Sequence, residues 1–277
     1  DLLEGRFIVE RMQAGINCLL GESLVDSTRP LLGKPTPFLG REQELALLEA
    51  TLNASVEEST AKAVVLIGAP GIGKSRLRHE FLRRLGAHGS DGALIFGRGD
   101  PLRAGQAYAL LGQALRRLCG VHEGEPPETA CQRLKHRIGQ HLNEVDKSRV
   151  GEFLSEAAGY QIPDEQSPKL RAARREPAQM SQGIRQALVD FLRAETSNCP
   201  LLVILDDLQW GDAPTVHAIE AALEELRRDD ARVEREGLDA LREDARELAR
   251  EEDVGELRVG VRPHPRAPLA PGDRREI

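Results

Sequence analysis

The feature that most constrains this chain is a glycine-rich turn between an apolar run and an amphipathic segment. It lies in the stretch "AVVLIGAPGIGKSRLRHEFLRRL", Ala63–Leu85. The apolar start predicts a buried strand at 63–67, and the pattern from about 74 to 85 predicts a helix. Glycines adopt backbone conformations that other residues avoid. Three of them at this junction predict a tight turn whose N–H groups point inward.

The spacing within the turn matches G-x-x-x-x-G-K-[ST], the phosphate-binding loop, because Gly68 is followed after four residues by Gly73-Lys74-Ser75. Inward N–H groups form a nest for an anion, and the N-terminal end of the following helix adds positive potential. We expect Lys74 to contact the β- and γ-phosphates of a nucleotide and the Ser75 hydroxyl to bind Mg²⁺. A plain strand-to-helix turn is the alternative. The expected nucleotide-binding residues of the loop are Gly68, Ala69, Pro70, Gly71, Ile72, Gly73, Lys74, Ser75 and Arg76.

A second apolar run, "PLLVILDD" (Pro200–Asp207), reads as a buried strand that ends in two acids. Adjacent carboxylates repel one another, and a bound cation offsets that cost. In P-loop enzymes the first acid holds Mg²⁺ and the next polarises the attacking water. We therefore assign Asp206 to the metal and Asp207, with Lys74, to catalysis. A helix N-cap next to a surface acid is the alternative.

The remaining pattern predicts an α/β P-loop NTPase fold with a parallel sheet and helices on both faces, incomplete at the C-terminal side. A third strand is expected at Ala93–Gly99. Apolar positions 45, 47, 48 and 52 predict a helix from about Arg41. Further helices are expected at about 105–118, 128–158 and 177–196, and after Asp212, which can cap the last one.

Composition shifts divide the chain into three parts. Residues 1–32 read as a hairpin remnant of a preceding domain, with strands near Phe7–Glu10 and Asn17–Leu20, and a linker. Residues 33–226 form the P-loop core. Residues 227–277 read as a charged helix and a disordered tail, or as a shifted reading frame. We expect "ELRVGVRP" (Glu256–Pro263) not to be a displaced fourth strand with Arg262 as sensor, and we assign no function after about 226.

Composition also excludes several classes of protein. A net charge of −7 disfavours a nucleic-acid surface, and no apolar run is long enough to span a bilayer. The four cysteines form no CxxC pair and the histidines no HExxH motif, so we expect reduced thiols, no zinc site and a cytoplasmic location. The chain begins at Asp1 rather than Met, as expected of a segment of a longer protein.

Three local features carry a family resemblance: "PFLGREQEL" (Pro37–Leu45), "GAPGIGKSRL" (Gly68–Leu77) and "LLVILDDLQWGDAPT" (Leu201–Thr215). The chain resembles the AAA+-like branch of P-loop NTPases. In particular, it resembles the signal-transduction ATPases with numerous domains, the origin-recognition-type AAA ATPase domains of bacterial multidomain regulators. The resemblance covers about Leu32–Leu226.

The resemblance implies ATP and Mg²⁺ as ligands, a sheet in 5-1-4-3-2 order and a regulated switch. It places Gly40 and Arg41 near the adenine and includes Trp210 and Asp212 among the shared residues. The partners it implies are other domains of the parent protein and nucleotide-dependent self-association. Direct binding to nucleic acid or a membrane is not expected.

Rival P-loop classes lack their own motifs in this chain. A GTPase would carry NKxD, and an ABC-type ATPase would carry LSGGQ where this chain has "SQGIRQ" (Ser181–Gln186). The acidic balance disfavours a helicase or clamp loader. A slow ATP-hydrolysing switch is therefore the main hypothesis. The alternatives are an ATP-binding oligomerisation module without significant hydrolysis and a small-molecule kinase, which shares the loop.

Overall fold

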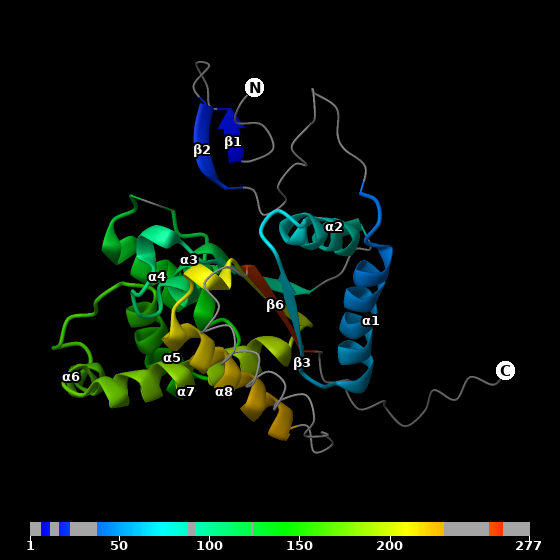
Figure 1. Cartoon of the computed structure of the whole chain (residues 1–277). Helices are drawn as coiled ribbons and strands as arrows, with labels where there is room; N and C mark the ends of the chain where they lie inside the picture. Colours follow the sequence, from blue (N-terminus) through cyan, green and yellow to red (C-terminus); the bar gives the residue numbers. More distant parts are fainter. Residues whose placement is uncertain are drawn as a thin grey trace.

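A computed structural model describes residues 7–11, 17–22, 38–87, 92–122, 124–229 and 255–262. The main sheet of this part has the strand order β3-β6-β5-β4 (Figure 1). Strands β4 and β5 pair in parallel, as the sequence predicts, whereas β6 pairs antiparallel with both β3 and β5. Three strands therefore share one direction and β6 runs against them. The strands are β3 (Lys62–Gly68), β4 (Ala93–Arg98), β5 (Leu201–Asp206) and β6 (Gly255–Arg262).

Strand β6 corrects two sequence expectations. We expected an entirely parallel sheet, and we expected residues after 226 to add a charged helix and a tail rather than a strand. Instead, β6 lies between β3 and β5 and pairs with both along its length. The alternation of leucine and valine in its sequence suits a strand in this position. Residues 230–254 and 263–277 lie outside the described part.

Helices cover both faces of the sheet (Figure 1). On one face, α1 and α2 bury Leu45, Leu48, Leu77 and Phe81 against Phe96 of β4 and Ile204 of β5. On the other face, a larger core joins α3, α7 and α8 to the sheet and extends into α4, α5 and α6. The helices are α1 (Glu42–Glu58), α2 (Lys74–Ala87), α3 (Ala109–Leu118), α4 (Pro127–Ile138), α5 (Glu144–Ala157), α6 (Pro168–Arg174), α7 (Pro177–Thr196) and α8 (Ala213–Asp229).

Three details of the helical predictions were wrong. The helix expected at 128–158 is two helices, because α4 ends at Ile138 and Asn143 caps α5 by accepting a hydrogen bond from the Asp146 N–H. The short helix α6 was not expected. In α1, Leu47 is 62% exposed and does not belong to the buried stripe.

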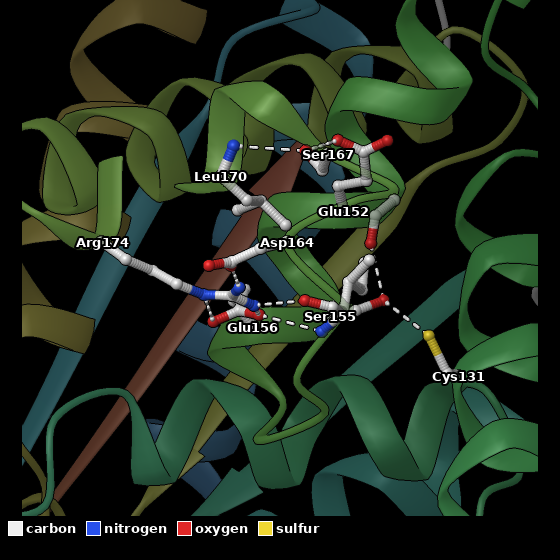
Figure 2. A network of polar contacts seen from close by, with 10 residues as sticks. Cys131, Glu152, Ser155, Glu156, Asp164, Ser167, Leu170 and Arg174 are labelled. Carbon is white, nitrogen blue, oxygen red and sulfur yellow. Dashed lines mark hydrogen bonds and ion pairs between the residues drawn. The ribbon is translucent and has the colours of Figure 1, made fainter. Parts of the chain in front are cut away.

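A polar network fastens α6 to α5 in the helical part of the chain (Figure 2). Arg174 pairs with Glu156 and Asp164 and donates to the Ile162 carbonyl oxygen at 2.7 Å. Nearby, the Ser167 hydroxyl caps α6 and donates to Glu152 at 2.6 Å. These contacts hold a seven-residue helix that is too short to be stable alone.

The cysteines and the N-terminal strands complete the described part. Burial raises the pKa of the Cys119 thiol to about 12, which keeps this thiol protonated at neutral pH.

Strands β1 (Phe7–Arg11) and β2 (Asn17–Glu22) pair antiparallel, as predicted. The turn expected at Ala14-Gly15 and the linker before 38 lie outside the described residues. None of the described helices combines the length and apolar character that crossing a membrane requires.

A buried ion pair between α4 and α7 provides a test of this helical packing. Arg137 donates two hydrogen bonds of 2.7 Å to Glu195, whose side chain is 2% exposed. We expect Glu195→Gln to lower the free energy of unfolding by about 3 kcal/mol, because it leaves the Arg137 charge without its carboxylate. The control is Glu144→Gln, which removes an exposed pair with Lys147 and should cost less than about 0.5 kcal/mol. Urea unfolding of both variants measures the difference, and equal losses would contradict the packing described.

Candidate nucleotide-binding site

The glycine-rich turn joins the end of β3 to the start of α2. Gly68 closes the strand and Lys74 opens the helix. Gly71 and Gly73 have φ angles of 79° and 103°, which side chains rarely tolerate, so glycine is required at both positions. Ala69 and Pro70, which follow the strand, are exposed, and Ile72 is half exposed. The backbone thus has the conformation expected of an anion-binding loop at a helix N-terminus.

The Lys74 ammonium lies across this loop. Its Nζ atom donates to the carbonyl oxygens of Gly68 at 2.5 Å and Ala69 at 3.2 Å. Ser75 follows it on the exposed side of α2, and Arg76 is half-buried. The charge of Lys74 is therefore at the loop, where a phosphate group would lie.

The segment before α1 reaches the same loop. Arg41 Nη2 donates to the Ile72 carbonyl oxygen at 3.3 Å, while its Nη1 atom pairs with Glu44 at 2.7 Å. Gly40 has a φ of 80°, and its N–H donates to the Glu42 carboxylate at 3.0 Å. The fold thus brings Arg41 against Ile72 of the glycine-rich turn, 31 positions away in the sequence.

The two acids of β5 occupy different environments. Asp206 is 2% exposed, whereas the Asp207 side chain is 38% exposed. Side chains alternate along a strand, so Asp206 lies on the same face as Leu202 and Ile204, the face that α2 covers. Burial raises the pKa of the Asp206 carboxyl; Asp207 adds to this shift, and the guanidiniums of Arg78 and Arg98 oppose it.

Two arginines that the sequence reasoning missed contact Asp206. Arg78 Nε lies 3.6 Å from Asp206 Oδ2, and the Arg98 Nε and Nη2 atoms are both 3.4 Å from the same oxygen. Both guanidiniums also lie near the Phe96 ring, at 4.8 Å and 6.0 Å from its centroid. Two sequence spacings could have indicated these arginines. Arg78 lies three residues after Ser75, on the same face of the helix, and Arg98 lies two residues after Phe96, on the same face of the strand.

Asp207 has a left-handed backbone, with φ 55° and ψ 47°. The flanking hydrogen bonds hold it: the Gly99 N–H donates to the Asp206 carbonyl oxygen at 2.8 Å, and the Trp210 N–H donates to the Asp207 carbonyl oxygen at 3.0 Å. Such a conformation costs a non-glycine residue about 1 kcal/mol or more and is found mainly where the surroundings fix it. The Asp207 carboxylate accepts a 3.4 Å hydrogen bond from Gln209 Nε2 and lies 3.8 Å from Arg98 Nε.

Asp212 connects the acid-bearing loop to α3. Its carboxylate is buried and accepts hydrogen bonds from the N–H groups of Tyr108, Leu110 and Thr215 at 2.8, 3.1 and 2.8 Å. The Thr215 hydroxyl donates a fourth hydrogen bond at 2.9 Å. Asp212 therefore caps α8, as predicted, and also fixes the start of α3.

The residues present fit a magnesium ion in their chemistry. Mg²⁺ prefers oxygen ligands, and it is usually held by one or two protein groups together with phosphate oxygens. Ser75 supplies a hydroxyl from α2 and Asp206 a carboxylate from β5. The Arg78–Asp206 contact joins the helix that carries Ser75 to the strand that ends in this carboxylate. Ser75 and Asp206 are therefore the groups of the described residues that would hold the ion.

Comparison with protein families shows the family to which the chain belongs. The model of the AAA ATPase domain matches residues 37–233, which is more than half of the 277 residues. The chain therefore belongs to this family, with an α/β fold and the nucleotide-binding P-loop of an AAA ATPase. Searches of curated proteins and of solved structures gave no match.

Gly99 provides a test of how the acid-bearing loop is held. A Cβ atom at this position would lie 2.1 Å from the Asp207 carbonyl oxygen and 2.9 Å from the Trp210 carbonyl carbon. We expect Gly99→Ala to displace the loop and to lower the free energy of unfolding by about 1–3 kcal/mol. Trp210 is the one tryptophan in the chain, so its fluorescence should change as well.

Gly86→Ala is the matched control, because a Cβ at Gly86 in α2 meets nothing within 4 Å. It should leave the fluorescence of Trp210 unchanged and keep or slightly raise stability. Identical behaviour of the two variants would show that Gly99 does not hold the loop.

Proposed function

We propose that this chain is the ATP-binding domain of a larger regulatory protein and that it hydrolyses ATP slowly as a switch. The observation that carries the proposal is the contact between the P-loop helix and the acid strand, made by Arg78 of α2 and Asp206 of β5. It joins the helix that follows the glycine-rich loop to the strand that ends in the two acids, which supports a single nucleotide site. The family match over 37–233 supports the ATP-binding part of this role, and we propose a core at 33–226 between a preceding segment and a charged one.

The proposed roles follow from the positions of the side chains. The loop N–H groups of residues 68–76 and Lys74 would bind the phosphates, and Arg41 and Gly40 would line the base side of the loop. Bound Mg²⁺ would neutralise phosphate charge, held by Ser75 and Asp206. Asp207, whose side chain is 38% exposed, would orient the attacking water.

Two features favour slow turnover. An aspartate at position 207 is one methylene shorter than a glutamate and reaches less far toward a water. The register also pairs Arg262 of β6 with Leu201, at the opposite end of β5 from Asp206. The backbone register therefore places Arg262 away from the end of β5 that carries the acids, where a sensor of the nucleotide would have to lie. A binding-only oligomerisation module and a small-molecule kinase remain the competing functions, and turnover without an added acceptor distinguishes them from the switch.

We expect Mg-ATP to bind in preference to GTP, with Lys74 as the main phosphate contact. Lys74→Ala should lower ATP affinity by about 2–3 kcal/mol, or about 30- to 150-fold, since it removes a charge-assisted contact. The control is Lys147→Ala, which removes an exposed lysine of α5 and should leave affinity unchanged. Calorimetry with both nucleotides measures these affinities, and equal ATP affinity in all three proteins would overturn the assignment.

Asp207→Asn separates binding from hydrolysis. Asparagine tolerates the left-handed backbone, so the loop should keep its shape while the carboxylate is lost. ATP affinity should stay the same, and phosphate release should fall by at least about 10²-fold. Asp100→Asn, in the neighbouring turn at Pro101–Arg103, is the control and should keep the parent rate. An Asp207→Asn protein as active as its parent would show that another group orients the water.

A further inference from the structure

Arg98 is placed between the two acids by the register of the sheet. Strand β4 pairs Arg98 with Asp206 of β5 directly, so the two side chains lie on the same face. Its Nε and Nη2 atoms lie 3.4 Å from Asp206 Oδ2, and Nε lies 3.8 Å from Asp207 Oδ2. One guanidinium therefore neutralises part of the charge of both carboxylates.

The two arginines at Asp206 differ in their freedom to move. The Arg78 side chain is 1% exposed and packs against Phe96 from α2. Arg98 is 29% exposed, and its contacts with Asp206 are at the long end of the hydrogen-bond range. Of the two guanidiniums, that of Arg98 is therefore the more exposed, and it also has a second acid, Asp207, to pair with.

Both oxygens of Asp206 are engaged in polar contacts. Oδ1 accepts from the Asp207 N–H at 3.2 Å, and Oδ2 faces both arginines. A cation that approaches Oδ2 meets the positive charge of both arginines, and of the two Arg98 is the more exposed. A metal ion and Arg98 in its present position thus compete for the same carboxylate oxygen.

We propose that Arg98 is a positioning residue that exchanges with Mg²⁺ at Asp206. In the metal-free state its guanidinium neutralises the two acids and keeps them from repelling the phosphates of a nucleotide. When Mg²⁺ binds with the nucleotide, Arg98 yields Asp206 Oδ2 and keeps its contact with Asp207. Arg98 therefore sets how strongly nucleotide affinity depends on Mg²⁺. This inference rests on the proposed ATP-binding function.

The test is the affinity for a non-hydrolysable ATP analogue, measured by calorimetry in Mg²⁺ and again in EDTA. In Arg98→Gln the affinity in EDTA should fall, because Asp207 loses its guanidinium partner and Asp206 retains only Arg78, so more negative charge opposes the phosphates. In Mg²⁺ it should be kept or increase, because the metal no longer displaces a guanidinium. The dissociation constant in EDTA divided by that in Mg²⁺ should therefore be about two- to fivefold larger in Arg98→Gln than in wild type. This is the range expected for one partly exposed ion pair.

Two control variants separate this effect from general electrostatics and from misfolding. Arg103→Gln removes the same charge from the same small hollow, which Arg98 and Arg103 both line, and should leave the ratio unchanged. Arg98→Lys retains the charge and should keep a ratio near that of wild type. An Arg98→Gln protein weakened equally in both conditions, or an equal rise in Arg103→Gln, would overturn the inference.

The same measurement separates this inference from the function on which it rests. If wild type binds the analogue more tightly than Lys74→Ala does, the ATP-binding part of the proposed function stands, and the ratio alone decides the role of Arg98. If wild type and Lys74→Ala bind equally, or neither binds, both proposals fall.

Discussion

The burial of the Asp206 carboxylate against α2 is the interaction on which the rest of the site depends. A carboxylate that is 2% exposed is costly to keep charged, and the guanidiniums of Arg78 and Arg98 offset that cost. Arg78 comes from α2 and Arg98 from β4, so the acid joins the P-loop helix to two neighbouring strands. Loss of Asp206 would therefore leave two guanidiniums from different elements without their shared acid.

The sequence predicted the parts of the fold that depend on local pattern. The apolar runs became β3, β4 and β5, and the glycine spacing became a loop with positive φ angles at Gly71 and Gly73. Asp212 was also correctly predicted as a cap, because a cap depends on residues only three positions apart. In each of these cases the physical cause lies within a few residues of its effect.

The parts that escaped prediction depend on contacts between distant segments. The direction of β6 is set by pairing with strands more than 50 residues away, which its own alternation does not specify. The roles of Arg78 and Arg98 appear only when α2 and β4 meet β5, since an arginine in a helix or at a strand end is ordinarily a solvated residue. Arg98 donates to an acid 108 positions along the chain.

The acid strand is also linked to the helical part of the chain through α3. Asp212 holds the N-terminal N–H groups of α3, and Gln113 of the same helix accepts a 2.7 Å hydrogen bond from the Arg98 N–H. Helix α3 in turn packs against β4, α5 and α8. Packed elements of this kind shift as units, because interiors are too dense to deform locally. A displacement of Asp206 or Arg98 that accompanied metal binding would therefore pass into α3 first, and from α3 into the helices that pack against it.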